Sequence, residues 1–249
     1  MQQRFELVQR LRRRRGVRRM RRVGIGYRRE LHDWLVNSPP EVSCLEVTAE
    51  HFYDGGDTLL ARLAACVPVS VHGLGLSLGT PGPLDHGELD RFCAVVERAG
   101  ARWVSEHVAF TRAGGVDLGH LNPVPCSRDS LATLSMHVAE VQRACGRRLL
   151  LENIAADLRL PGEMDEPAFL DELCRRTGCG LLLDLANLYV NAHNHGYDPR
   201  RWLDAIDPRH VVQVHIVGYS EHGRRLSDEH ARSIQPELYD LLDVVADFP

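Results

Sequence analysis

The sequence contains no lysine: all 30 of its basic residues are arginine. Enzymes that form a Schiff base with a carbonyl substrate, or that bind pyridoxal phosphate covalently, need a lysine, so the sequence excludes both classes. A phosphate-binding loop that depends on its lysine is excluded for the same reason. The chain also lacks a run of about 18 apolar residues, so we expect no membrane-spanning helix.

Cysteine pairs of the CxxC type are absent too, although the chain has seven cysteines. These cysteines are scattered, and four of them lie inside apolar or helical stretches, which indicates neither a zinc ribbon nor a disulfide framework. We therefore expect buried, reduced thiols in a cytoplasmic protein. The seven residues are Cys44, Cys66, Cys93, Cys126, Cys145, Cys174 and Cys179.

The first 29 residues contain 12 arginines, which is the main irregularity in the charge distribution. No apolar segment follows them, so they do not form a secretory signal. We interpret residues 1–22 as an arginine-rich extension and residues 23–249 as a barrel domain that binds metal. A basic segment can bind nucleic acid, but the chain beyond Arg29 is acidic, so we do not expect nucleic acid as a partner.

From Val23 onward, short apolar runs alternate with amphipathic stretches, as is typical of a parallel β-sheet with connecting helices. The resulting fold class is α/β, a TIM-like (β/α)8 barrel. Seven units are recognisable, and we expect the eighth strand to be missing or truncated before Pro249. Strands are predicted at 23–27, 44–49, 67–72, 101–107, 148–152, 180–185 and 211–216. Helices are predicted at 30–37, 57–65, 85–99, 127–145, 165–177, 198–206 and 231–246.

Five of the apolar runs end in a side chain that can bind a metal ion or exchange a proton. Parallel barrel strands bring their carboxyl ends to one face, so residues far apart in sequence can converge there on one ion. These residues are His72, His107, Glu152, Asp184 and His215. Because neighbouring residues of a strand point to opposite faces, we favour His107 as a ligand and Glu106 as its neighbouring or surface partner.

Glu152 and Asp184 each end a leucine-rich run, where a buried charge needs a cation, a salt bridge or strong hydrogen bonds. Asn153 and Asn187 lie beside them and offer neutral oxygen atoms. We interpret the polar, histidine-rich segment 191–198 as a loop at the same face.

A further pair of ligands is predicted in the segment DEH at 228–230, after the last predicted strand. Alternate residues of an extended segment point to the same side, so Asp228 and His230 can chelate one ion. The complete set of candidates is His72, His107, Glu152, Asp184, Asn187, His215, Asp228 and His230. Eight such ligands exceed the needs of one ion, which indicates two or more metals. Imidazole and carboxylate ligands without thiolate suit iron or manganese, and also zinc.

With these motifs the chain resembles the multinuclear non-heme iron-dependent oxidative enzymes. The best-known members make the oxazolone and thioamide of methanobactin or process the C-terminal cysteine of a carrier peptide. The likeness extends over about residues 23 to 246. It rests on GIG (24–26), EVTAE (46–50), HGLGLSLG (72–79), SEH (105–107), EN (152–153), LDLAN (183–187), NHG (194–196), HIVG (215–218) and DEH (228–230).

The resemblance implies a TIM-like barrel with two or three iron ions, which uses dioxygen to oxidise cysteine residues of a ribosomally made precursor peptide. It places the eight candidate residues at the family's iron-binding positions. It also implies a partner protein that presents the leader of the peptide. The chain differs from the family at His51, where asparagine is usual, whereas Phe52 matches the aromatic residue that usually follows. It also lacks a strand-eight carboxylate before Pro249.

Two other classes of function remain compatible with the residues. One is a divalent-metal isomerase or an endonuclease-like phosphodiesterase on a similar barrel, because such enzymes also carry His, Asp and Glu ligands at their strand ends. The other is a degenerate, non-catalytic binding protein. Metal analysis of the purified protein distinguishes these three classes of function. The sequence assigns no catalytic acid or base.

Overall fold

The computed structural model describes residues 23–36 and 42–249, except for the side chains of His230 and Ala231. The predicted extension at 1–22 therefore lies outside the described residues. Within the described part, no helix has both the length and the apolar character needed to cross a membrane.

Seven parallel strands form one curled sheet in the order β1-β2-β3-β4-β7-β8-β9. The central strands β3, β4, β7 and β8 are buried throughout, as expected for a sheet covered on both sides. Leu149, Leu150 and Leu151 of β7 are all fully buried. The strands are β1 Gly24–Gly26, β2 Cys44–Thr48, β3 Val69–His72, β4 Val104–His107, β7 Leu149–Glu152, β8 Gly180–Asp184 and β9 Val211–His215.

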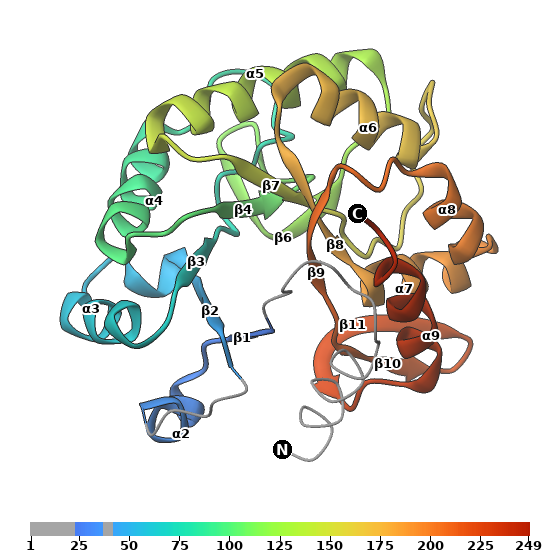
Figure 1. Cartoon of the computed structure of the whole chain (residues 1–249). Coiled ribbons are helices and arrows are strands. Elements are labelled where there is room, and N and C mark those ends of the chain that lie inside the picture. Colours follow the sequence, from blue (N-terminus) through green and yellow to red (C-terminus); the bar gives the residue numbers. More distant parts are fainter. Residues whose placement is uncertain (1–22, 37–41) are drawn as a thin grey trace.

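Helices cover the convex side of the curled sheet, where α3, α4, α5, α6 and α8 follow one another in an arc (Figure 1). The α-helices are α2 His32–Val36, α3 Asp57–Cys66, α4 His86–Ala99, α5 Arg128–Cys145, α6 Glu166–Thr177, α7 Leu185–His195, α8 Pro199–Ala205 and α9 Pro236–Val245. Two short 3-10 helices, η1 Arg29–Leu31 and η2 Ala49–Phe52, follow β1 and β2. The described residues thus form the α/β fold with a TIM-like curled sheet that the sequence predicted.

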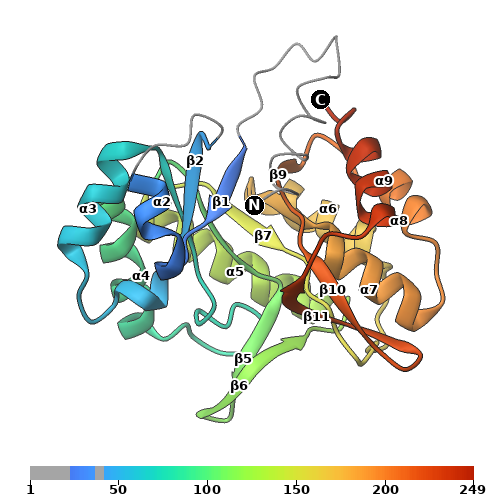
Figure 2. The ribbon, with the colours of Figure 1, turned by 90° about the horizontal axis from the view of Figure 1, so that it is seen from below.

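Two antiparallel hairpins extend the polypeptide beyond the carboxyl ends of β4 and β9. The first pairs β5 (Ala109–Ala113) with β6 (Val116–Pro123), and the second pairs β10 (Gly218–His222) with β11 (Arg225–Arg232). Both hairpins project on the same side of the molecule (Figure 2). They therefore flank the end of the sheet at which the candidate ligands lie.

Each of the seven predicted strands contains an observed strand, but two other predictions were wrong. The segment 191–198 is not a loop at its start, because α7 continues to His195. The helix predicted from 231 begins only at Pro236, since β11 extends to Arg232. Asp228 consequently lies on a strand and not in a loop. Both hairpins went unpredicted.

The expectation of buried, reduced thiols throughout was also wrong. Cys93 of α4 and Cys145 of α5 form a disulfide with a Cα–Cα distance of 5.1 Å. Cys66 is an exposed thiol, whereas Cys174 and Cys179 are buried with their sulfur atoms 3.6 Å apart. The disulfide joins two neighbouring helices of the outer layer and lies away from the concave side of the sheet.

Candidate metal centre

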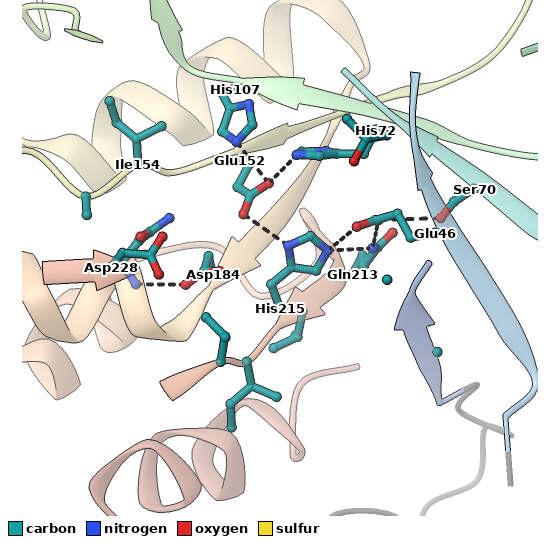
Figure 3. A pocket seen from close by; sticks show the side chains of 18 of the residues that line it. Glu46, Ser70, His72, His107, Glu152, Ile154, Asp184, Gln213, His215 and Asp228 are labelled. Carbon is teal, nitrogen blue, oxygen red and sulfur yellow. Dashed lines mark hydrogen bonds and ion pairs between the residues drawn. The ribbon is translucent and has the colours of Figure 1, made fainter. Parts of the chain in front are cut away.

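The parallel register of the strands brings the predicted ligands to one level of the sheet. His107 of β4 pairs with Glu152 of β7, and Asp184 of β8 pairs with His215 of β9. His72 of β3 lies opposite Ser105 of the neighbouring strand β4, which also carries His107. These side chains point together at the carboxyl end of the sheet (Figure 3). Strand ends that are distant in sequence thus form one cluster, as the sequence predicted.

Five of the eight predicted ligands form two groups that share one member. The first group is His72, His107 and Glu152, and the second is Glu152, Asp184 and His215. Within each group the potential ligand atoms lie within 4.8 Å of one another. Atoms at such separations can all reach one central ion, since bonds from metals to nitrogen and oxygen are about 2 Å long.

Glu152 lies at the centre of the cluster and faces three imidazole rings. Its Oε2 is 3.4 Å from Nε2 of His72 and 3.5 Å from Nε2 of His107, while its Oε1 is 3.1 Å from Nδ1 of His215. The carboxylate therefore divides its two oxygens between the two groups. Burial alone would raise the pKa of Glu152, but the facing His215, His72 and His107 hold this pKa well below its ordinary value.

Two of the imidazole rings are fixed from behind by hydrogen bonds. Nδ1 of His72 lies 2.8 Å from the hydroxyl of Ser105, and Nδ1 of His107 lies 3.1 Å from Oε1 of Glu106. Metal-binding histidines usually bond their second ring nitrogen in this way, which sets the orientation of the ring. In both residues Nε2 is thus left to face Glu152.

The pKa values of these two histidines are shifted in opposite directions. Burial lowers the pKa of His72 despite the nearby Glu152. Burial would also lower the pKa of His107, but the hydrogen bond to Glu106 and the charge of Glu152 raise it. Glu106 is fully enclosed behind His107 and also accepts a hydrogen bond from the backbone N–H of Leu76.

Asp184 has two separate functions at the junction of β8 and α7. Its Oδ1 accepts a hydrogen bond of 2.7 Å from the backbone N–H of Asn187 and so caps α7. Its backbone N–H donates to Oδ1 of Asn153, which fixes the end of β8. Burial, followed by the charge of Glu152, raises the pKa of Asp184 to about 7.

Three buried oxygen atoms in the cluster accept no hydrogen bond: Oε2 of Glu152, Oδ2 of Asp184 and Oδ1 of Asn187. A buried polar atom that lacks a hydrogen bond is costly, and more so when it belongs to a carboxylate. A bound cation would satisfy such atoms, since Glu, Asp and Asn oxygens are all metal ligands. The side chains present therefore fit metal ions.

Two of the other predicted ligands, Asn187 and Asp228, lie at the edge of the cluster. Asn187 is buried in the first turn of α7, and its amide donates to the backbone oxygen of Asn153. Asp228 of β11 lies beside Asp184 (Figure 3). The side chain of His230 lies outside the described residues.

Glu46 and Gln213 belong to the cluster but were not predicted. Oε1 of Glu46 lies 2.9 Å from Nε2 of His215, and the amide of Gln213 donates to Oε2 of Glu46. A signal for both was present, because each is a polar residue inside an otherwise apolar strand. The sequence alone could not show that β2 and β9 face each other across the concave side of the sheet.

A cavity of about 2770 Å³ adjoins the cluster and extends along the concave side of the sheet. Its lining includes Glu152, Asp184 and His215 together with apolar side chains such as Ile154 and Val190. Leu158 belongs to this lining and is 66% exposed. The cavity is thus large enough for an extended ligand and reaches the surface beside an apolar rim.

Solved structures of very different sequence share the fold of this chain. Endonuclease IV from Thermus thermophilus aligns with a TM-score of 0.59 at 19% identity, over 92% of this chain and 88% of that one. A xylose isomerase domain protein from Planctomyces limnophilus aligns with a TM-score of 0.54 at 13% identity, over 91% and 87% of the two chains. At such low identities these likenesses describe the fold alone.

Closer relatives appear among sequences. A UPF0276 protein from Chromobacterium violaceum is 40% identical over 219 residues, which are 87% of this chain and 79% of the relative. A second UPF0276 protein, from Anaeromyxobacter sp. (strain Fw109-5), is 35% identical over 230 residues, or 90% and 81% of the two chains. Residues 22–248 match the family model described as RiPP precursor modification enzyme MbnB/TglH/ChrH. RiPPs are ribosomally synthesised and post-translationally modified peptides, and the chain belongs to this family of enzymes that modify their precursors.

Proposed function

We propose that this protein is a multinuclear iron-dependent oxidase that modifies cysteine residues of a ribosomally synthesised precursor peptide and uses dioxygen as the oxidant. The observation that carries the proposal is that Glu152 belongs to two groups of potential ligands at once. A carboxylate shared by two such groups suits a pair of neighbouring metal ions. Membership of a family that modifies RiPP precursors supports a peptide as the substrate.

The donor atoms support iron as the metal. Imidazole and carboxylate ligands without thiolate suit ferrous ions. His72, His107 and Glu152 would hold one ion, and Glu152, Asp184 and His215 would hold the second. We propose that the remaining candidates complete the coordination of the second ion or bind a third ion. These candidates are Asn187, Asp228 and His230. Bound iron would supply one-electron redox chemistry towards a thiolate and dioxygen.

The residues of the chain itself would orient the ligands and enclose the substrate. Ser105 and Glu106 hold the rings of His72 and His107 with Nε2 towards Glu152. The buried Ile154 and Val190 line the cavity beside the cluster and would limit the access of water to it. The length of the cavity along the sheet favours an extended peptide segment over a small metabolite.

The proposal includes two features that come from the sequence, the first from the family resemblance and the second from the pattern of cysteines. One is a partner protein that presents the leader of the precursor peptide, and the other is a cytoplasmic location. It also treats residues 23–249 as one barrel domain, with residues 1–22 as an extension to it.

Anaerobic reconstitution tests the proposal. The protein is loaded with Fe(II) and mixed with a short cysteine-bearing peptide encoded beside its gene, and oxygen uptake and peptide mass are followed. We expect uptake and a mass change that both disappear when serine replaces the cysteine of the peptide. The Glu152→Gln variant should be inactive. Glu166→Gln is the matched control, because Glu166 is a partly buried glutamate that accepts a hydrogen bond from Trp202 on the outer layer.

Other outcomes favour the alternatives. A zinc-loaded protein that cleaves a phosphodiester or isomerises a sugar, without any need for iron, would support the isomerase or phosphodiesterase class. A protein that retains neither metal would support a non-catalytic homologue. Oxygen uptake that is independent of the peptide cysteine would contradict the proposed substrate.

A further inference from the structure

A chain of hydrogen bonds crosses the concave side of the sheet and ends at His215. The indole N–H of Trp103 donates to Oε1 of Gln213 over 2.8 Å, and Nε2 of Gln213 donates to Oε2 of Glu46 over 2.7 Å. Oε1 of Glu46 lies 2.9 Å from Nε2 of His215. Figure 3 shows Glu46, Gln213 and His215 side by side, with Glu152 beyond the ring of His215.

The direction of each hydrogen bond follows from the first donor. An indole N–H can only donate, so the atom of Gln213 that faces Trp103 must be the amide oxygen. The amide NH₂ of Gln213 therefore faces Glu46 and His215. A carboxylate can only accept, so the Nε2 proton of His215 is donated to Glu46.

The same carboxylate brings the side chains of Gln213 and His215 together. Nε2 of Gln213 lies 3.2 Å from Nε2 of His215. Because both of these nitrogens donate to Glu46, they lie next to each other as two donors on one acceptor group. Ser70 adds a third donor to the same carboxylate, with its hydroxyl 3.4 Å from Oε2 of Glu46. Glu46 is thus bonded from several directions and holds a fixed position.

The consequence concerns the opposite nitrogen of the ring. When Nε2 of a neutral imidazole carries the proton, the lone pair that can bind a metal is on Nδ1. In His215 this atom faces Oε1 of Glu152 at 3.1 Å, and the proton that it shares with this carboxylate would be displaced when a metal ion binds. His72 and His107 have the reverse arrangement, with Nδ1 bonded from behind and Nε2 facing Glu152.

We propose that Glu46 is a positioning residue, held by Gln213 and Trp103, that directs Nδ1 of His215 to the second metal ion. This inference rests on the proposed metal centre and adds the ligand atom that each histidine uses. Glu46 itself is not a ligand in this assignment. The two groups of converging ligand atoms found among the described residues do not include it, and its carboxylate is already occupied by three donors.

Nitrogen NMR of the zinc-loaded protein tests the assignment directly. Long-range ¹H–¹⁵N spectra of ¹⁵N-histidine protein distinguish the two tautomers, and zinc is diamagnetic. We expect His215 to keep its proton on Nε2 and to bind zinc through Nδ1, while His72 and His107 bind through Nε2. A zinc-bound Nε2 in His215 would overturn the inference and leave the metal centre intact.

Variants along the chain of hydrogen bonds test the positioning role. In Glu46→Gln and Trp103→Phe we expect the affinity for the second zinc ion to fall about 10- to 100-fold, as when the bonding partner of a metal-binding histidine is removed. The affinity for the first ion should stay within about twofold in both variants. Trp103→Phe keeps an aromatic ring, although a smaller one, and removes the donor to Gln213.

The remaining outcomes separate this inference from the proposed function. Equal loss of both ions in Glu46→Gln, or no loss in either variant, would contradict the positioning role. The Glu166→Gln control should bind both zinc ions normally. A wild-type protein that binds no zinc at either group would defeat the proposed metal centre itself and the inference with it.

Discussion

Glu152 is the residue on which the candidate centre depends, because it alone belongs to both groups of ligands. The three imidazoles around it approach from β3, β4 and β9, and each offers a ring nitrogen to one of its two oxygens. Removal of a peripheral ligand should therefore affect one ion, whereas removal of Glu152 should affect both.

The first prediction compares these two kinds of change. His72→Ala and His107→Ala should each remove about one metal equivalent and leave the far-ultraviolet circular dichroism largely intact. Glu152→Ala should remove both equivalents, because no other carboxylate among the described residues belongs to both groups. Plasma emission analysis of anaerobically purified protein gives the metal content. Full retention of metal in both histidine variants would contradict the assignment.

The second prediction concerns Asp184 in the metal-free protein. Its pKa is raised from 3.8 to about 7, mainly by burial and then by the charge of Glu152. Between these two pH values the folded state keeps a proton that the unfolded chain has already released. The contribution of Asp184 to the free energy of unfolding is therefore lost as the pH rises from about 4 through about 7. The melting temperature should fall across that window. The nearby His215 lowers the pKa of Asp184, and the charge of Asp228 raises it.

The control for this prediction is Asp184→Asn, which removes the titrating group and keeps a side-chain oxygen for the cap of α7. Its melting temperature should depend less on pH between 4 and 7 than that of the wild type. Identical pH profiles for the two metal-free proteins would show that Asp184 does not titrate in this range.

At the scale of the element, the junction between β8 and α7 links helix capping to the centre. Oδ1 of Asp184 caps the helix, which leaves Oδ2 as the oxygen available for a metal. The third prediction is that Asp184→Ala lowers the unfolding free energy of the metal-free protein by about 1 kcal/mol relative to Asp184→Asn, the usual value of an N-cap. Urea unfolding of both variants at pH 5 measures this difference, and equal stabilities would contradict the capping role.

The elements that could be predicted from sequence are those with a regular apolar pattern. Leu149 to Glu152 and Gly180 to Asp184 are runs of apolar residues with a carboxylate at the end, and both became buried strands. Asp85 and Asp165, a residue type typical of helix starts, each accept a hydrogen bond from a first-turn N–H. Gly100, Gly146 and Gly178, a residue type typical of helix ends, each have a positive φ.

The elements that could not be predicted lack such a pattern. The β5–β6 hairpin is largely exposed, so its strands carry no apolar face that a sequence pattern would reveal. Helix α7 buries polar residues of its own, such as Asn187 and Asn191. Their side-chain amides donate hydrogen bonds to backbone oxygens of the segment after β7. Polarity there reflects internal hydrogen bonds and was mistaken for exposure to solvent.

At the scale of the whole molecule, the curled sheet determines which residues meet. Glu46 and Gln213 are 167 residues apart in sequence and bond across the concave side. Sequence patterns placed each on a strand but gave no distance between them. The strand-end ligands were predictable because the fold class alone places them at one face, whereas contacts across the sheet depend on its curvature.

The fourth prediction follows from the linkage of metal binding to folding. Ligands must lose protons to bind a metal ion, and a metal that binds only the folded state stabilises it. Addition of Zn²⁺ should therefore raise the melting temperature more at pH 8 than at pH 5, which opposes the trend of the metal-free protein. Differential scanning calorimetry at both pH values measures this effect. An equal increase at both pH values would indicate binding outside the cluster.

Anomalous diffraction at the iron edge, from crystals of the anaerobic Fe(II)-loaded protein, tests the central claim most directly. We expect two strong peaks on either side of the Glu152 carboxylate, each about 2 Å from its ligand atoms. One peak should contact His72 and His107, and the other should contact Asp184 and Nδ1 of His215. A single peak, or iron bound away from Glu152, would contradict the proposed two-ion centre.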